Sequence, residues 1–239
     1  MDEEISPNSM ELQTIDYVTS AAKAALSTVP FAGSLLAEVA GMVIPNQRIE
    51  RIVKFAKILD SKISSIDQDI IRMQFTNENF TDLLEEGLRQ AARSLTDERR
   101  EYIASVIANS ISSDRIDFLE SKFILHILGE LNDIEIIWLR FYLTPYIQGD
   151  EGFRSKHKGI IETPPAHIGA SQKVIDKDTL KDGYREHLVQ RGLLKHKYDM
   201  DHGSGLPEFD RYTGGPKVRG YELTPLGRLL LREAGLTTL

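Results

Sequence analysis

The longest apolar and small-residue segment of the chain, residues 18–44, constrains the fold more than any other feature. Its length suffices to cross a membrane, which takes about 20 predominantly apolar residues. Pro30 divides it, however, and Lys23 and Glu38 would each cost roughly 2–3 kcal/mol inside a bilayer. We therefore expect two helices joined near Pro30 and buried in the protein's own helical bundle, so that any membrane action follows their release.

Small residues recur at every fourth position in the second arm of this segment. Gly33, Ala37 and Gly41 share one helix face, and such a strip lets another helix backbone approach closely. We interpret it as a helix-packing strip that serves oligomerisation or conditional membrane insertion.

A run of amphipathic helices follows this segment. Apolar residues spaced three and four apart predict a helix with a continuous buried seam over Ile49, Ile52, Ala56, Leu59, Ile63 and Ile66. The same kind of spacing predicts helices at 78–95, 97–112 and 115–131, the first capped by Asn77 or Thr76 and the second by Thr96.

The helical periodicity also predicts which side chains are buried. It places Leu95, Leu119 and Phe123 on buried sides and Arg100 on an exposed face. Residues 10–131 are then a helical bundle domain that follows a disordered tail at residues 1–9.

Residues 132–239 have a different pattern. A short apolar helix with the only tryptophan, Trp138, comes first, and a long loop is expected at 144–174. Asp176 then caps a predicted helix, 177–191, whose core-facing row is Leu180, Tyr184 and Leu188. A Gly- and Pro-containing hairpin reaches about Gly220, and a last helix begins at Thr224-Pro225 and is closed by Gly235.

This order of helix, "RGLL", hairpin and "YELTPLGRLLL" resembles the winged-helix superfamily over roughly residues 132–235. The resemblance implies a fold that is mainly α, a helical bundle followed by a C-terminal winged-helix-like module with a small β-hairpin. It also implies that the helix before the wing contacts nucleic acid or a partner. The expected binding residues are Lys177, Lys181 and Arg185 on the exposed side of that helix and Lys195, Lys197, Arg211, Lys217 and Arg219 on the wing.

The distribution of charged residues does not by itself decide between nucleic acid and a protein partner. Residues 1–152 carry a net −11 and residues 153–239 a net +4, which indicates either two modules with different partners or a charge-matched contact between them. An acidic row, Asp178, Asp182 and Glu186, lies beside the basic row of the predicted helix. It offsets the cations that phosphate binding requires, so both a protein partner and nucleic acid stay open.

Residues 17–62 and the stretch "LLEEGLRQAARSLTDERREYIASVIANSI" are similar to helical bacterial proteins of abortive-infection type or of unknown function. That resemblance implies a role in phage defence, which composition and periodicity do not themselves indicate.

Catalytic motifs are missing from the sequence. It contains no HExxH, GxxxxGK[ST], GxGxxG after a strand or GxSxG. The absence of cysteine excludes disulfides and thiolate metal sites. The run HKYDMDH contains metal-ligand types in His196, Asp199, Asp201 and His202, but their spacing matches no standard site and turn formation is the commoner use. We predict no enzyme activity, no cofactor and no metal.

We interpret the chain as a non-enzymatic bacterial interaction protein, in phage defence or stress response, whose winged-helix module recognises a partner. The alternative is a winged-helix DNA-binding transcriptional regulator that dimerises through its helical domain. Both interpretations expect a homo-oligomer or a protein partner, and the first adds a membrane contact only after conformational release of the apolar segment. The acidic start MDEEISPNSM lacks the basic region of a secretory signal, so we expect a cytoplasmic protein.

Overall fold

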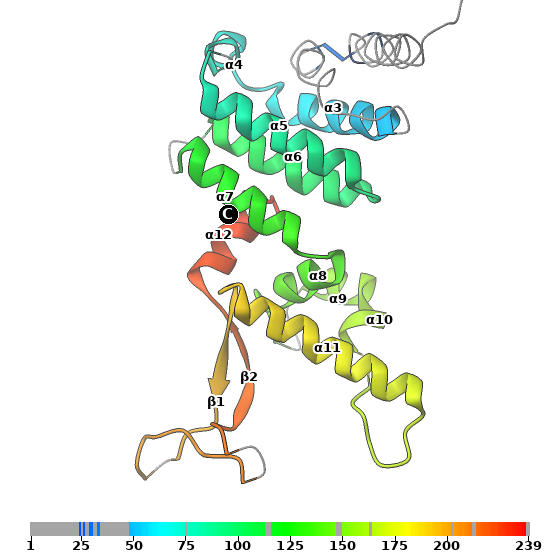
Figure 1. The fold of residues 1–239 in the computed structure, drawn as a ribbon, viewed down its shortest axis with the longest axis vertical. Coiled ribbons are helices and arrows are strands. Elements are labelled where there is room, and N and C mark those ends of the chain that lie inside the picture. The colour runs from blue at the N-terminus through cyan, green and yellow to red at the C-terminus, as the bar shows by residue number, and fades with distance from the viewer. Residues whose placement is uncertain are drawn as a thin grey trace, which may run out of the picture. The chain divides into compact units, whose positions relative to one another are not determined.

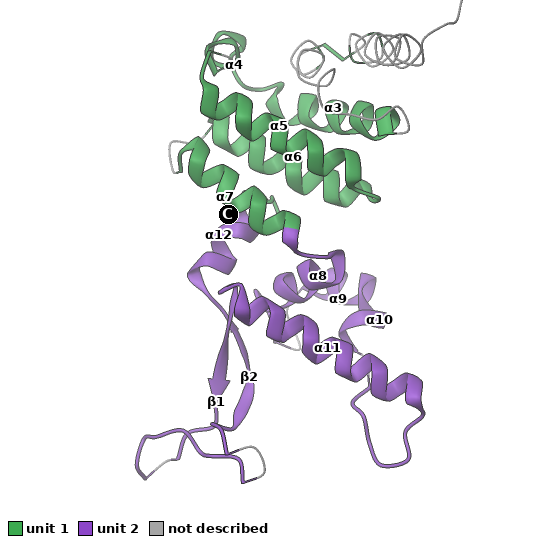
Figure 2. Cartoon of the chain, in the orientation of Figure 1, with its two compact units in different colours: residues 1–129, 233–238 green, residues 130–232, 239 purple. Residues whose placement is uncertain are grey.

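The protein is mainly helical, with one small antiparallel sheet near its C-terminus (Figure 1). This confirms the predicted fold class at that level. The computed structural model describes residues 24, 26, 29–30, 33, 48–74, 76–112, 116–146, 150–162, 164–201, 203–211 and 214–237. The chain divides into two compact units, unit 1 with residues 1–129 and 233–238, and unit 2 with residues 130–232 and 239 (Figure 2).

Unit 1 is a bundle of helices that bury the faces expected from their apolar spacing. On its first described helix, Ile52, Ala56, Leu59 and Ile63 are buried as predicted. That helix, α3 (Ile49–Ile63), packs on α5 (Glu78–Arg93) and on α6 (Asp97–Ser112), and α5 and α6 also pack on each other. The helices are α3 (Ile49–Ile63), α4 (Gln68–Gln74), α5 (Glu78–Arg93), α6 (Asp97–Ser112) and α7 (Phe118–Glu130).

The predicted caps of the central helices are confirmed. The Asn77 side chain accepts a hydrogen bond from the Asn79 backbone N–H at 3.0 Å, at the start of α5. Thr96 Oγ1 accepts one from the Arg99 N–H at 3.2 Å, at the start of α6. These contacts satisfy donors that a helix leaves unpaired at its N-terminus, and α6 has the predicted bounds.

Several predicted exposures are wrong, and that of Leu95 follows from a helix end that differs from the expected one. Helix α5 ends at Arg93, so Leu95 lies past its last turn and is 81% exposed. Helix α7 begins at Phe118 and leaves Leu119 and Phe123 exposed. Arg100 is only 3% exposed, since its guanidinium donates to the Ser94 carbonyl oxygen at 2.7 Å.

The break at Pro30 agrees with the prediction. Leu26 and Gly33 are helical and buried, while Val29 and Pro30 form a bend and turn between them. A Cβ at Gly33 would overlap the Leu26 carbonyl oxygen, so glycine at this position allows the close approach of residue 33 to Leu26. Ala37 and Gly41 lie outside the described residues, and the strip they were predicted to form stays a prediction.

Unit 2 contains a long helix, a β-hairpin and shorter helices around them. Two of these short helices lie within the segment expected to be a long loop, and the long helix begins after Ser171, five residues before the predicted Asp176 cap. The elements are α8 (Asp133–Phe141), α9 (Glu151–Lys156), α10 (Lys158–Ile161), α11 (Gln172–Gln190), β1 (Leu194–Tyr198), β2 (Val218–Leu223) and α12 (Pro225–Glu233).

Local sequence determines the ends of α8 and α12. Asn132 and Glu135 form a reciprocal capping box at the start of α8. Thr224 Oγ1 accepts from the Gly227 N–H at 3.0 Å and donates back toward the carbonyl oxygens that precede β1. Gly235 has a φ of +71°, a left-handed conformation that suits glycine after a helix. The predicted start and stop of the last helix are confirmed.

Within the described residues, no helix is both long enough and apolar enough to cross a membrane.

Candidate functional site

The predicted binding helix, α11, uses two of its basic side chains, Lys181 and Arg185, in contacts within unit 2. Lys177 is exposed, as expected. Lys181 instead forms an ion pair with Asp178, in which both side chains are largely buried. Arg185 has a side chain only 20% exposed and pairs with Asp182 at 3.3 Å. The predicted exposed basic row is therefore wrong for Lys181 and Arg185.

Arg185 also stacks on aromatic rings from two other elements. Its guanidinium carbon lies 4.3 Å from the centroid of the Trp138 ring on α8 and 5.7 Å from that of Tyr221 on β2. Such a cation–π contact contributes roughly 0.5–2 kcal/mol and favours arginine because its planar group lies flat on the ring. The arrangement holds α11 against α8 and leaves the guanidinium little freedom to reach a phosphate.

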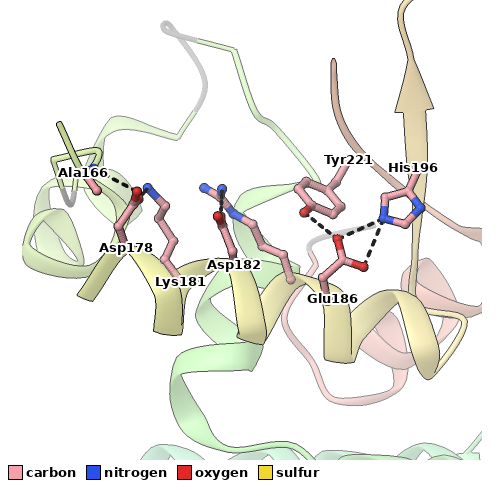
Figure 3. A network of polar contacts seen from close by, with 8 residues as sticks. Ala166, Asp178, Lys181, Asp182, Glu186, His196 and Tyr221 are labelled. Carbon is pink, nitrogen blue, oxygen red and sulfur yellow. Dashed lines mark hydrogen bonds and ion pairs between the residues drawn. The ribbon is translucent and has the colours of Figure 1, made fainter. Parts of the chain in front are cut away.

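The acidic row of α11 is equally engaged. Asp178 accepts a hydrogen bond from the Ala166 backbone N–H at 2.8 Å and one from Lys181 (Figure 3). The Ala166 N–H, and then Lys181, lower the pKa of Asp178. This carboxylate ties the segment before α11 to the helix.

Glu186 joins α11 to the hairpin. Its carboxylate lies 2.9 and 3.1 Å from His196 Nε2 on β1 and accepts a hydrogen bond from the Tyr221 hydroxyl of β2 at 2.8 Å (Figure 3). His196 and Tyr221 face each other in the strand register, so one carboxylate holds both strands. We call these three residues the α11–wing clasp.

The environment of the clasp perturbs its ionisable groups. Desolvation alone would raise the pKa of Glu186, but the hydrogen bonds from His196 and Tyr221 outweigh it and lower the pKa. Burial, and then the hydrogen bond to Glu186, raise the pKa of Tyr221. The Tyr142 ring contacts the Tyr221 ring in a tilted arrangement, at 5.8 Å between centroids, and burial raises the pKa of Tyr142 as well. Tyr221 therefore remains a protonated donor at neutral pH, which suits a structural contact.

A second carboxylate–histidine contact joins α11 to α8. Glu135 is buried, and its Oε1 lies 2.6 Å from His187 Nδ1. The Arg191 Nε–H donates to the other ring nitrogen, Nε2, at 3.2 Å. The two ring nitrogens of His187 thus contact residues of two different segments, Glu135 on α8 and Arg191 just after α11.

Most basic residues of the wing are paired with wing carboxylates. Lys217 Nζ lies 3.0 Å from Asp199 and 3.6 Å from Glu208, and the hydrogen bond that Lys217 donates to Asp199 is the largest cause that raises the pKa of Lys217. Arg219 lies 3.9 Å from Asp199. Arg211 is exposed. Lys195 pairs with Glu222 at 3.4 Å across the hairpin.

The candidate metal ligands are used in other ways. Asp201 closes a turn by accepting hydrogen bonds from the Ser204 hydroxyl and backbone N–H and from the Gly203 N–H, which lower its pKa. His196 belongs to the clasp. In the described part of the chain, no three His, Asp or Glu side chains are placed to hold a metal ion, and His202 lies outside it.

Sequence reasoning missed the contacts that define this site. The spacing of residues along α11 correctly assigns its basic and acidic residues to different sides of the helix. It does not indicate which of these sides packs against the rest of unit 2. Leu180, expected to face the core, is 55% exposed, so the predicted apolar row turns outward at that point. The sequence feature that comes nearest to indicating these contacts is the apolar helix around Trp138. A ring as large as that of Trp138 needs contacts on more than one side, and Arg185 provides one of them.

The Glu186 contacts predict a pH-dependent contribution to stability. The pKa of Glu186 is lower in the folded protein than its ordinary value of 4.5, so the unfolded state binds more protons and stability rises with pH. We expect Glu186→Gln to lower the free energy of unfolding by about 1 kcal/mol at neutral pH. The difference should be present above pH 4.5 and disappear as the pH falls through the lower folded pKa.

Urea unfolding at several pH values measures this difference. Glu222→Gln is the matched control, because Glu222 is half exposed and pairs only across the strand surface, so its effect should stay within about 0.5 kcal/mol. An equal, pH-independent effect of both substitutions would contradict the clasp.

Comparison with models of known protein families gives no match for this chain. Comparisons with curated proteins and with solved structures give none either.

Proposed function

We propose that unit 2 is a winged-helix module that recognises a protein partner rather than nucleic acid. Support for the fold comes from the order of α8, the short helices, α11, a two-stranded hairpin and α12. The glycine and threonine contacts between α12 and the start of β1 add to it. In this proposal α11 is the recognition helix and the β1–β2 hairpin, residues 194–223, is the wing.

We choose a protein partner over nucleic acid because basic residues of unit 2 are paired with carboxylates of the same unit. Counterion release supplies most of the affinity of nucleic-acid binding, and it requires cations that are free to meet phosphates. Lys181, Arg185 and Lys217 are paired with carboxylates of the same unit. The net positive charge of residues 153–239 is therefore larger than the charge that is free to bind a ligand.

The broader role of the protein is inferred from the two resemblances, to the winged-helix superfamily and to helical bacterial proteins of abortive-infection type. We propose a non-enzymatic interaction protein of bacterial defence or stress response, in which the apolar N-terminal segment acts in oligomerisation or in conditional membrane action. The buried Leu26 and Gly33 support a resting state in which that segment is packed inside the protein.

A DNA-binding regulator is the second candidate, and one observation favours it. Lys177 and Arg211 are exposed, on α11 and on the wing respectively, so a few cations remain available to phosphates. The salt dependence of DNA binding grows in proportion to the number of phosphates that a protein neutralises, which makes the two candidates separable.

Fluorescence anisotropy of a labelled DNA duplex at about 20 mM salt separates them. We expect no saturable binding below about 100 µM protein. Micromolar affinity that falls steeply with salt, and that weakens in Lys177→Ala with Arg211→Ala, would refute the protein-partner proposal.

A further inference from the structure

We draw no further inference here: the strongest candidate, the cavity of about 450 Å³ between the N-terminal ends of α5 and α7 in unit 1, has its polar groups Asn77 and Asp117 already engaged with backbone N–H groups at those helix ends, and nothing in the structure shows what fills it.

Discussion

Replacing Trp138 with alanine is expected to lower the free energy of unfolding of unit 2 by about 3–5 kcal/mol. The indole is 2% exposed and contacts the rings of Phe141 and Tyr142 as well as the Arg185 guanidinium. Removing it leaves a cavity and also takes away the surface on which that guanidinium is stacked. Urea unfolding followed by far-ultraviolet circular dichroism measures the loss without depending on tryptophan fluorescence.

The control for this substitution is Tyr146→Ala in the same unit. Tyr146 is an exposed aromatic residue, so its removal should change stability by no more than about 0.5 kcal/mol. A loss below about 1 kcal/mol for Trp138→Ala would contradict the position of Trp138 as the core of unit 2.

Gly227→Ala is expected to lower the free energy of unfolding by about 2–3 kcal/mol. A Cβ at this position of α12 would overlap the Leu193 carbonyl oxygen and lie 2.7 Å from Leu223 Cδ1. The Leu193 oxygen is backbone and accepts hydrogen bonds from Thr224, so it cannot move aside without breaking the start of the helix. The substitution therefore tests the close approach of α12 to the base of the hairpin.

Gly183→Ala is the matched control, because Gly183 also lies inside a helix of unit 2 but has open space around its Cα. Alanine is favoured over glycine there, and we expect a gain of about 0.5–1 kcal/mol. Opposite signs for the two substitutions support the packing described, and the same sign for both would contradict it.

Local patterns predicted much of the fold. The threonine, proline and glycine signals around α12 and the Asn77 cap of α5 depend on neighbouring residues alone, so the sequence was sufficient to place them. The burial of Ile52 and Leu59 on α3 follows from helical spacing in the same way. Leu95 was misplaced because periodicity continues through a helix end that only tertiary contacts determine.

The candidate site was less predictable, since its contacts join distant segments. Arg185 was expected on an exposed row, and its stacking on Trp138 depends on how α8 meets α11. Glu186 was assigned to an acidic row that merely dilutes positive charge, yet it binds both strands of the hairpin. No spacing rule connects these residues, because each pair is brought together by the tertiary fold.

The central claim is that Lys181 and Arg185 of α11 are bound inside unit 2 and are not offered to phosphate. The most direct measurement is the nuclear magnetic resonance signal of the Arg185 Nε–H, identified by its loss in Arg185→Lys. We predict an upfield-shifted signal, because the guanidinium lies over the Trp138 ring, and no change when duplex DNA is added. A signal at the position of a freely solvated arginine, or one that moves on addition of DNA, would contradict the claim.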